Sequence, residues 1–279
     1  MIGKYINKNG RRKKIALCFL TYDGHAKGDV WTNNINKSKN KHYFNFYVHN
    51  KNDIPVDDFL KTYEIPDKID TQWADISLVR ATLLLFKEAL KDPDNEYFIL
   101  LSDKCIPIYN LDFIYDMICT SSYSILDVSA GYNPLHDKYR KDRLESVQSY
   151  VGHSDNFKKS SQWMCLTKKD ASFFVNNDYT EVFKNCWAAD EHYFCNIIHK
   201  NNIKHLNRVI TFANWNEPSD NPKSRGGNQR NFPKTHNSLS IQQVQLARNT
   251  GAFFMRKIPK HCVICCKALS LINETFSSY

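Results

Sequence analysis

The segment DISLVRATLLLFKEALKDPDNEYFILLS, from Asp75 to Ser102, decides the fold because it holds a helix and a buried strand in succession. Its first part carries apolar residues at intervals of three and four, namely Ile76, Val79, Leu83, Phe86 and Leu90. That spacing predicts an amphipathic helix. The second part, EYFILLS, is a short apolar run of the kind that forms buried strands.

Apolar runs on either side extend the same pattern. KIALCFLT (Lys14–Thr21) and HYFNFYVHN (His42–Asn50) predict two strands before this segment. After it, LDFIYDMI predicts a helix, SYSILDVS a strand, DEHYFCNIIHK a helix and HLNRVITF a strand. Such alternation predicts an α/β domain with a Rossmann-like, mostly parallel sheet flanked by helices. We expect a single domain over residues 14–260, a basic and flexible N-terminal arm at 1–13, and a C-terminal tail at 261–279.

The ends of the predicted strands indicate where a site should lie. In open α/β sheets, ligands bind beyond the carboxyl ends of the strands. This rule selects Thr21, Asn50 and the pair Ser102-Asp103. It argues against DPD (residues 92–94), which matches the Asp-x-Asp pattern by which many nucleotide-sugar enzymes bind a divalent cation. DPD precedes its strand, so we interpret it as a helix-to-strand turn at the opposite edge.

The net charge of +9 is compatible with a nucleic-acid partner. Much of this charge is scattered, and the one dense run, NKNGRRKK (Asn7–Lys14), is typical of a solvated tail. A positive surface equally suits an enzyme whose substrate is a diphosphate. The hydrophobic content of 42% excludes a chain that is disordered throughout.

The nine cysteines are odd in number and irregularly spaced, and no secretory signal is present, which favours thiols over disulfides. The run HCVICC, with His261, Cys262, Cys265 and Cys266, lacks a second ligand pair at zinc-site spacing, so we expect no metal there. No apolar run is long enough to span a bilayer, and we expect a soluble chain.

The segment AADEHYF (Ala188–Phe194) places two carboxylates at the start of a predicted helix. Glu191 can be a catalytic base, or Asp190 and Glu191 can be first-turn acids stabilised by the helix dipole. From the residues alone the structural interpretation is favoured, because acids are common in first turns. Asp190 is then the better candidate for the helix cap.

Seven blocks of the sequence, in order, resemble the Core-2/I-branching glycosyltransferases (glycosyltransferase family 14), especially their plant-type branch. The blocks are FYVHNKND, WADISLVRATLLLFKEAL, NEYFILLSDKCIPIYNLDFIYDMI, FKKSSQWMCLTKKDASFFVNND, AADEHYF, VITFANW and GAFFMRKI. They are similar to the family's Ile-His-x-Asp strand end, Trp-Gly-Gly-x-Ser-Leu-Val helix, Ser-x-x-Cys-Ile-Pro turn, Trp-Arg-Lys-Gly-Ser-Gln-Trp segment, Asp-Glu-x-(Tyr/Phe)-Phe helix start, Val-Asp-Trp strand and Phe-Ala-Arg-Lys-Phe tail. From the first block to the last, they span most of residues 14–258.

The resemblance implies a GT-A fold that transfers a sugar from a UDP-sugar with inversion and without a metal ion. Glu191 stands at the position of the family's catalytic base. Arg256 and Lys257 match basic residues that hold the donor diphosphate. Asn50 stands where many members carry an Asp near the uracil, and we expect Thr21, Ser102 and Asp103 beside the donor with it. Asp190 is expected next to the substrate.

Aromatic and polar residues complete the expected acceptor side. Gln162 and Trp163, in SSQWMC, are expected there, with Trp163 offering an apolar face to a sugar ring. A buried core Trp is an equally open interpretation, and Trp215 is a similar case. His49 and His192 are interpreted as structural histidines.

One departure concerns the fit of the nucleotide, since Ala74 and Asp75 replace the family's Gly-Gly. Apart from the resemblance, we expect NPKSRGGNQR (residues 221–230) to form a flexible loop from which Lys223, Arg225 or Arg230 closes over phosphate.

The sequence therefore predicts an inverting, metal-independent glycosyltransferase that uses no cofactor and takes a UDP-sugar as co-substrate. N-acetylglucosamine is the default sugar, followed by xylose and glucuronic acid, and the acceptor is a hydroxyl of a glycan or glycoprotein. The alternatives are a nucleic-acid-binding protein that uses the basic surface, and an inactive relative that binds a glycan or nucleotide. The Golgi relatives are type II membrane proteins. Without such an anchor we expect a cytoplasmic protein, and a location in the Golgi lumen only if an anchor was removed. The abundance of Lys, Asn and Ile indicates an AT-rich genome, such as that of a protist or of a large virus, in which case the cytoplasm is that of the host cell.

Overall fold

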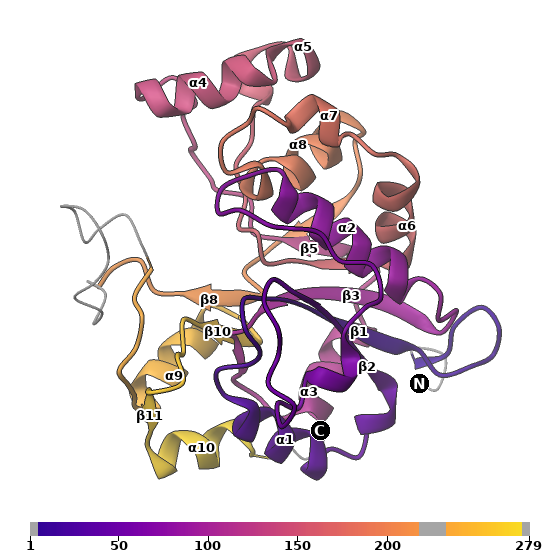
Figure 1. Cartoon of the computed structure of the whole chain (residues 1–279), viewed down its shortest axis with the longest axis vertical. Coiled ribbons are helices and arrows are strands. Elements are labelled where there is room, and N and C mark those ends of the chain that lie inside the picture. Colours follow the sequence, from indigo (N-terminus) through magenta and orange to yellow (C-terminus); the bar gives the residue numbers. More distant parts are fainter. Residues whose placement is uncertain (1–4, 218–232, 275–279) are drawn as a thin grey trace.

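A six-stranded sheet forms the centre of the computed structural model, which describes residues 5–217 and 233–274 (Figure 1). Its strand order is β2-β1-β3-β6-β5-β7. The strands are β1 (Lys14–Thr21), β2 (Phe44–Asn50), β3 (Asn95–Ser102), β5 (Ser124–Leu126), β6 (Cys165–Thr167) and β7 (His205–Asn207). β1 pairs in parallel with β2 and β3, β5 pairs in parallel with β7, and β6 runs antiparallel to β3 and β5. The predicted α/β class, with a mostly parallel sheet flanked by helices, is confirmed.

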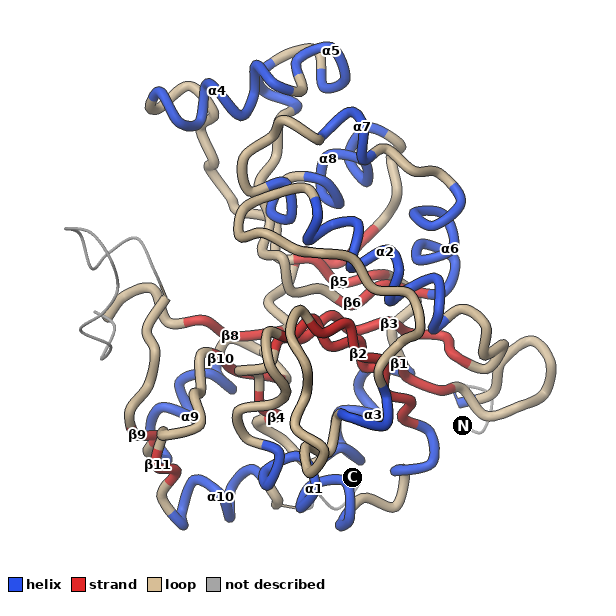
Figure 2. Tube along the Cα trace, in the orientation of Figure 1, coloured by secondary structure: helices blue, strands red, loops and turns tan. Residues whose placement is uncertain are grey.

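Helices cover both faces of this sheet (Figures 1 and 2). On one face lie α2 (Ser77–Ala89), α6 (Lys168–Asn176), α7 (Thr180–Phe183) and α8 (Tyr193–Lys200), and on the other lie α1 (Gly28–Lys37) and α3 (Leu111–Cys119). The long connection between β5 and β6 carries α4 (Lys138–Ser146) and α5 (Gln148–Val151). Short 3-10 helices are η2 (Lys41–Tyr43), η3 (Lys61–Tyr63), η4 (Ser154–Asn156) and η5 (Ala189–Glu191).

The helix α2 forms where the apolar spacing predicts it and contacts β1, β2 and β3. Its buried face includes Val79, Leu85 and Phe86, whereas Leu83 is only partly buried. The Asp75 carboxylate accepts a hydrogen bond from the Ser77 amide at 2.8 Å, just before the helix. The strand β3 is buried at every position except Glu96, as expected for a strand with helices on both sides.

A second hydrophobic cluster surrounds two smaller sheets. One has the order β4-β10-β8, with β4 (Ile106–Pro107), β10 (Phe254–Arg256) and β8 (Thr211–Ala213), and the other pairs β9 (Ser238–Leu239) with β11 (Val263–Ile264). The helices α9 (Ile241–Asn249) and α10 (Cys266–Ile272) cover them. The run HLNRVITF, expected as one strand, is therefore two short strands, β7 and β8, in different sheets.

The two ends of the described chain differ from the predicted arm and tail. The Asn7 side-chain amide donates to Asp94 Oδ1 at 2.9 Å, and the Arg12 guanidinium lies 4.7 Å from the Tyr43 ring centroid. At the other end, Ala268 and Ile272 of α10 are fully buried in the second cluster. Both ends thus make contacts with the folded body, although residues 8–12 are exposed to solvent.

Asp92, Pro93 and Asp94 form the turn that precedes β3, as predicted. Asp92 Oδ2 lies 2.8 Å from Lys14 Nζ, and Asp94 bonds to Asn7. No disulfide joins the nine cysteines, in agreement with the expectation of thiols. Among residues 5–217 and 233–274, no helix has the length and apolar character needed to cross a membrane.

The fully buried Phe86 ring joins α2 to β3 and α8, since its centroid lies 6.0 Å from that of Phe98 and 6.3 Å from that of Phe194. Phe86→Ala should lower the free energy of unfolding by about 3–5 kcal/mol, because it leaves a cavity that neighbouring rings cannot fill. Urea denaturation measures this loss as a lower midpoint at an unchanged slope. The exposed neighbour Lys87 provides the control: Lys87→Ala should stay within about 0.5 kcal/mol of wild type. Equal midpoints for the two variants contradict the assignment of Phe86 to the core.

Candidate active site

The carboxyl ends of β1, β2 and β3 meet at one edge of the sheet, as predicted. In the strand register Thr21 pairs with Asn50, and Leu20 pairs with Ser102. The Thr21 hydroxyl donates to Asn50 Oδ1, and the Gly24 amide donates to the same oxygen at 3.3 Å. The polar side chains chosen from the sequence are therefore neighbours in space.

The segment after β1 crosses this edge and binds to the turn after β3. The Ala26 amide donates to the Asp103 carbonyl at 2.9 Å. His25 Nδ1 accepts from the Lys27 amide, so Nε2 carries the proton that bonds to the Cys105 carbonyl at 3.0 Å. Burial lowers the pKa of His25 to about 3, which keeps the ring neutral. Sequence analysis missed His25, although its place shortly after a strand end was a usable signal.

Arg256 ends β10, and Lys257 follows it, so the small sheet carries two cations to the same region. The Arg256 guanidinium lies 4.4 Å from the ring centroid of Trp163, within the range of a cation–π contact. Burial lowers the pKa of Arg256, whereas the charges of Asp103 and Asp190 act in the opposite direction. Arg256 is therefore within electrostatic range of both acids.

Lys257 is a cation whose charge is easily lost. Burial is the main cause that lowers its pKa to about 8, and the positive charges of Arg256 and Lys104 add to the decrease. The Asp103 carboxylate acts against it. A lysine in this state is half neutral near pH 8, unlike a solvated lysine.

Asp190 is not a helix cap, which corrects the interpretation from the sequence. The helix α8 starts after His192, whose side chain makes no capping hydrogen bond, and Asp190 lies in the separate turn η5. Its Oδ1 atom is buried without a hydrogen-bond partner in the part of the chain that the structure describes. Burial, and then the charge of Glu191, raise the pKa of Asp190 to about 7. The left-handed Ala188, with a φ of 57°, begins η5, and His192 then separates η5 from α8.

Glu191 keeps part of its carboxylate exposed and is fixed by contacts with one neighbouring segment. Its Oε2 atom lies 3.1 Å from Lys159 Nζ, with the Glu191 side chain 27% exposed. The Glu191 carbonyl accepts from the Ser160 amide at 2.9 Å. Lys159 was not predicted as a site residue, although it belongs to the block FKKSSQW on which the resemblance rests.

The remaining predicted residues differ in their exposure to solvent. Trp163 is 6% exposed and has the Arg256 guanidinium over its ring, so the structure shows the buried alternative and not an open face. Gln162 beside it is partly exposed, and Trp215, after β8, is 52% exposed. His49 is buried and accepts from the Ile69 amide, and His192 is buried against Phe157, which agrees with structural roles.

Lys223, Arg225 and Arg230 lie outside the described residues. Within 5–217 and 233–274, no group of three or more His, Cys, Asp or Glu side chains has the geometry of a metal site. Asp92 and Asp94 lie at the amino end of β3, across the sheet from the strand ends described above.

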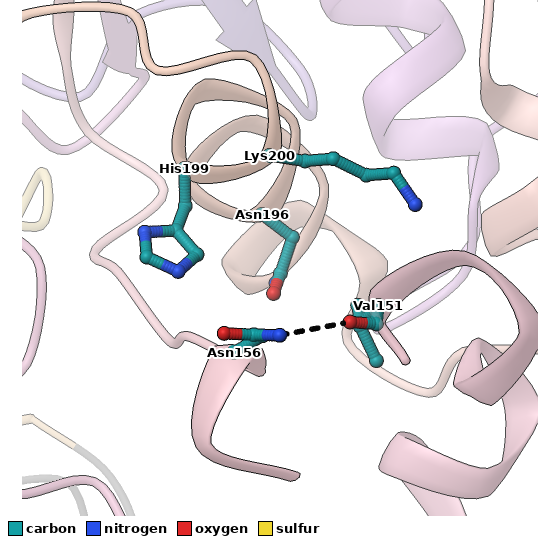
Figure 3. A pocket seen from close by; sticks show the side chains of 5 residues that line it. All are labelled: Val151, Asn156, Asn196, His199 and Lys200. Atoms are coloured by element: carbon teal, nitrogen blue, oxygen red, sulfur yellow. Dashed lines mark hydrogen bonds between the residues drawn. The ribbon is translucent and has the colours of Figure 1, made fainter. Parts of the chain in front are cut away.

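A small pocket lies elsewhere, beside the later turns of α8. Its volume is about 170 Å³, and Val151, Asn156, Asn196, His199 and Lys200 line it (Figure 3). The Asn156 side chain closes one side through a hydrogen bond to the Val151 carbonyl at 3.3 Å. None of the predicted site residues lines this pocket, so it is not the site assembled at the strand ends.

Comparisons with known proteins identify the family of the chain. A family model described as Core-2/I-branching enzyme matches residues 15–247. Glycosyltransferase BC10 of Oryza sativa subsp. japonica is 29% identical over 203 residues, which are 61% of this chain and 48% of the rice protein. The chain thus matches about half the length of that relative.

Among solved structures, the galactosyltransferase LgtC in complex with donor and acceptor sugar analogues gives a TM-score of 0.42 at 9% identity, covering 71% of this chain and 75% of LgtC. An active-site mutant of LgtC gives 0.41 at 10% identity, covering 75% and 81%. The family model carries the assignment, since it spans well over half of the sequence. The protein belongs to the Core-2/I-branching enzyme family.

Proposed function

We propose that this protein is a glycosyltransferase that moves a sugar from a UDP-sugar to a hydroxyl group of a glycan or glycoprotein, with inversion and without a metal ion. One observation carries the proposal. Arg256, at the end of β10, lies within electrostatic range of Asp190 in η5 and of Asp103 after β3, although the three residues are distant in the sequence. Lys257 follows Arg256 and Glu191 follows Asp190. Transfer from a nucleotide sugar requires positive charge on the leaving side and a base on the acceptor side.

Arg256 and Lys257 supply the leaving-side charge. The guanidinium offers a planar fork of donors, whereas the lysine ammonium is a compact charge on a flexible stem. Burial makes both more effective, because charge–charge interactions are stronger where water is excluded. Departure of UDP places negative charge on the diphosphate, and these cations stabilise it.

Glu191 supplies the base. As the acceptor oxygen attacks the anomeric carbon, its proton moves to the Glu191 carboxylate, and the bond from the anomeric carbon to UDP breaks. A single displacement of this kind inverts the anomeric configuration. Lys159 holds the carboxylate through Oε2, which leaves Oε1 for the acceptor hydroxyl. The rice relative's name, glycosyltransferase, supports this reaction class. We take N-acetylglucosamine as the default sugar, ahead of xylose and glucuronic acid.

A screen of UDP release over a panel of UDP-sugars, with and without glycan acceptors, tests the proposal. One donor should release UDP in an acceptor-dependent manner, and the rate should survive excess EDTA, because fixed cations carry the leaving-group charge. Loss of the rate on chelation, with recovery in Mn²⁺, contradicts the metal-free part and directs attention to Asp103. Absence of UDP release from every donor contradicts the reaction class.

Glu191→Gln should lower the rate of transfer by about 10²–10⁴, because the amide cannot accept the acceptor's proton. Folding and UDP affinity should be unchanged, since the side chain keeps its shape. Steady-state kinetics and calorimetry with UDP measure the two effects. The exposed Glu181, which pairs with Arg80 and Lys184, gives the matched control Glu181→Gln. If the two variants transfer sugar equally well, the base is another group.

The UDP affinity should fall as pH rises from 7.5 to 9.5, because the pKa of Lys257 is about 8 in the free protein. Below that pH the lysine is already charged when UDP binds. Above it, binding must take up a proton, so the dissociation constant increases by up to about tenfold per pH unit. Lys257→Arg keeps its charge over the whole range and should show a flat profile. Calorimetry at several pH values measures both, and parallel profiles for wild type and variant rule out Lys257 as the titrating group.

A further inference from the structure

Two exposed tryptophans, Trp73 and Trp187, form a corner on the surface beside the carboxylates. Their side chains are 72% and 48% exposed. The ring centroids are 5.3 Å apart and the ring planes meet at 80°. Large indole rings are usually mostly buried in soluble proteins, and adjacent exposed ones mark a binding surface. We call this pair the tryptophan corner.

The backbone beneath the corner is held in a strained form. The Ala188 amide, next to Trp187, donates to the carbonyl of Ala74, next to Trp73, at 2.7 Å. Both alanines adopt positive φ angles, 62° for Ala74 and 57° for Ala188. Residues with a Cβ atom rarely adopt this region, and such strain persists where the surroundings enforce it, commonly at binding sites. The backbone segments that carry the two indoles are therefore joined by one hydrogen bond between two strained residues.

Charged side chains border the corner. The Arg143 guanidinium from α4 lies 4.2 Å from the ring centroid of Trp187 and covers one face of it. Burial raises the pKa of the Cys186 thiol to about 11, and the Asp190 carboxylate contributes to this rise, so Asp190 lies close to the residue that precedes Trp187. Glu191 follows directly in the chain. The corner thus combines two apolar walls with a cation on one side and the paired acids on another.

We propose that the tryptophan corner binds a pyranose ring of the acceptor glycan and presents one of its hydroxyls to Glu191. A sugar ring has an apolar face of C–H groups, which indoles can cover, and a rim of hydroxyls, which Arg143 and the acids can bond. As an acceptor subsite the corner rests on the proposed function. As a carbohydrate-binding surface it can be tested without any turnover.

Saturation-transfer NMR tests it with methyl β-D-galactopyranoside, methyl β-D-glucopyranoside and methyl β-D-xylopyranoside as probes. At least one glycoside should receive saturation from the wild-type protein through its ring C–H protons. Trp73→Ala and Trp187→Ala should abolish the signal, with UDP affinity and melting temperature unchanged, since both side chains are exposed. Tyr123→Ala, at a 43% exposed aromatic between α3 and β5, should keep the signal and serves as the control.

Kinetics then connect the corner to catalysis. In Trp187→Ala the KM for the acceptor should rise by about tenfold or more while the KM for the donor stays constant, and Trp187→Phe should recover much of the loss. Glycoside binding that is the same in wild type and both alanine variants overturns the proposal, as does a wild-type protein that binds none of the three probes. If glycosides bind at the corner but no UDP-sugar is consumed, the proposed function fails and the carbohydrate-binding surface stands.

Discussion

The parallel alignment of β1 with β2 and β3 is the constraint on which the site depends. Thr21 pairs with Asn50, and Leu20 pairs with Ser102, so β1, β2 and β3 end side by side. The residues that follow each strand therefore lie at the same edge of the sheet. The turn after Ser102 leads into β4, and β4 pairs with β10, the strand that ends in Arg256. The position of the cations therefore follows from the register of the central strands through two short steps of backbone pairing.

Periodicity explains what could be predicted from the sequence. The α2–β3 unit and the meeting of the strand ends follow from apolar spacing and from the geometry of parallel sheets. The cap assigned to Asp190 was wrong because spacing carries no information on the separate turn η5, which begins at the left-handed Ala188 and ends before His192, the residue that precedes α8. The break between β7 and β8 and the folded ends depend on long-range contacts that no local pattern encodes. Lys159 was missed for a related reason, since its partner Glu191 is remote in the chain.

The centre of the site is built from polar groups whose hydrogen-bonding capacity is not used within the described chain. Asp190 Oδ1 and Arg256 Nε are both buried without a hydrogen-bond partner there. Each such group costs about 1–3 kcal/mol of stability, so a protein selected only for stability would pair or remove them. Their neighbours Asp103 and Lys257 also have pKa values shifted by burial towards the neutral form. A cluster of buried ionisable groups with shifted pKa values is typical of functional sites, where a charged ligand supplies the missing hydrogen bonds.

The strand β10 lies between the two hydrophobic clusters, since Phe254 belongs to the main core and Met255 to the second cluster. Phe254 stacks on Trp31 of α1, with the ring centroids 6.0 Å apart. Protein interiors are close-packed, so we expect a change of side-chain volume in either cluster to be transmitted along this short strand to Arg256. Each of the two clusters therefore has a direct mechanical connection to the position of one candidate site residue.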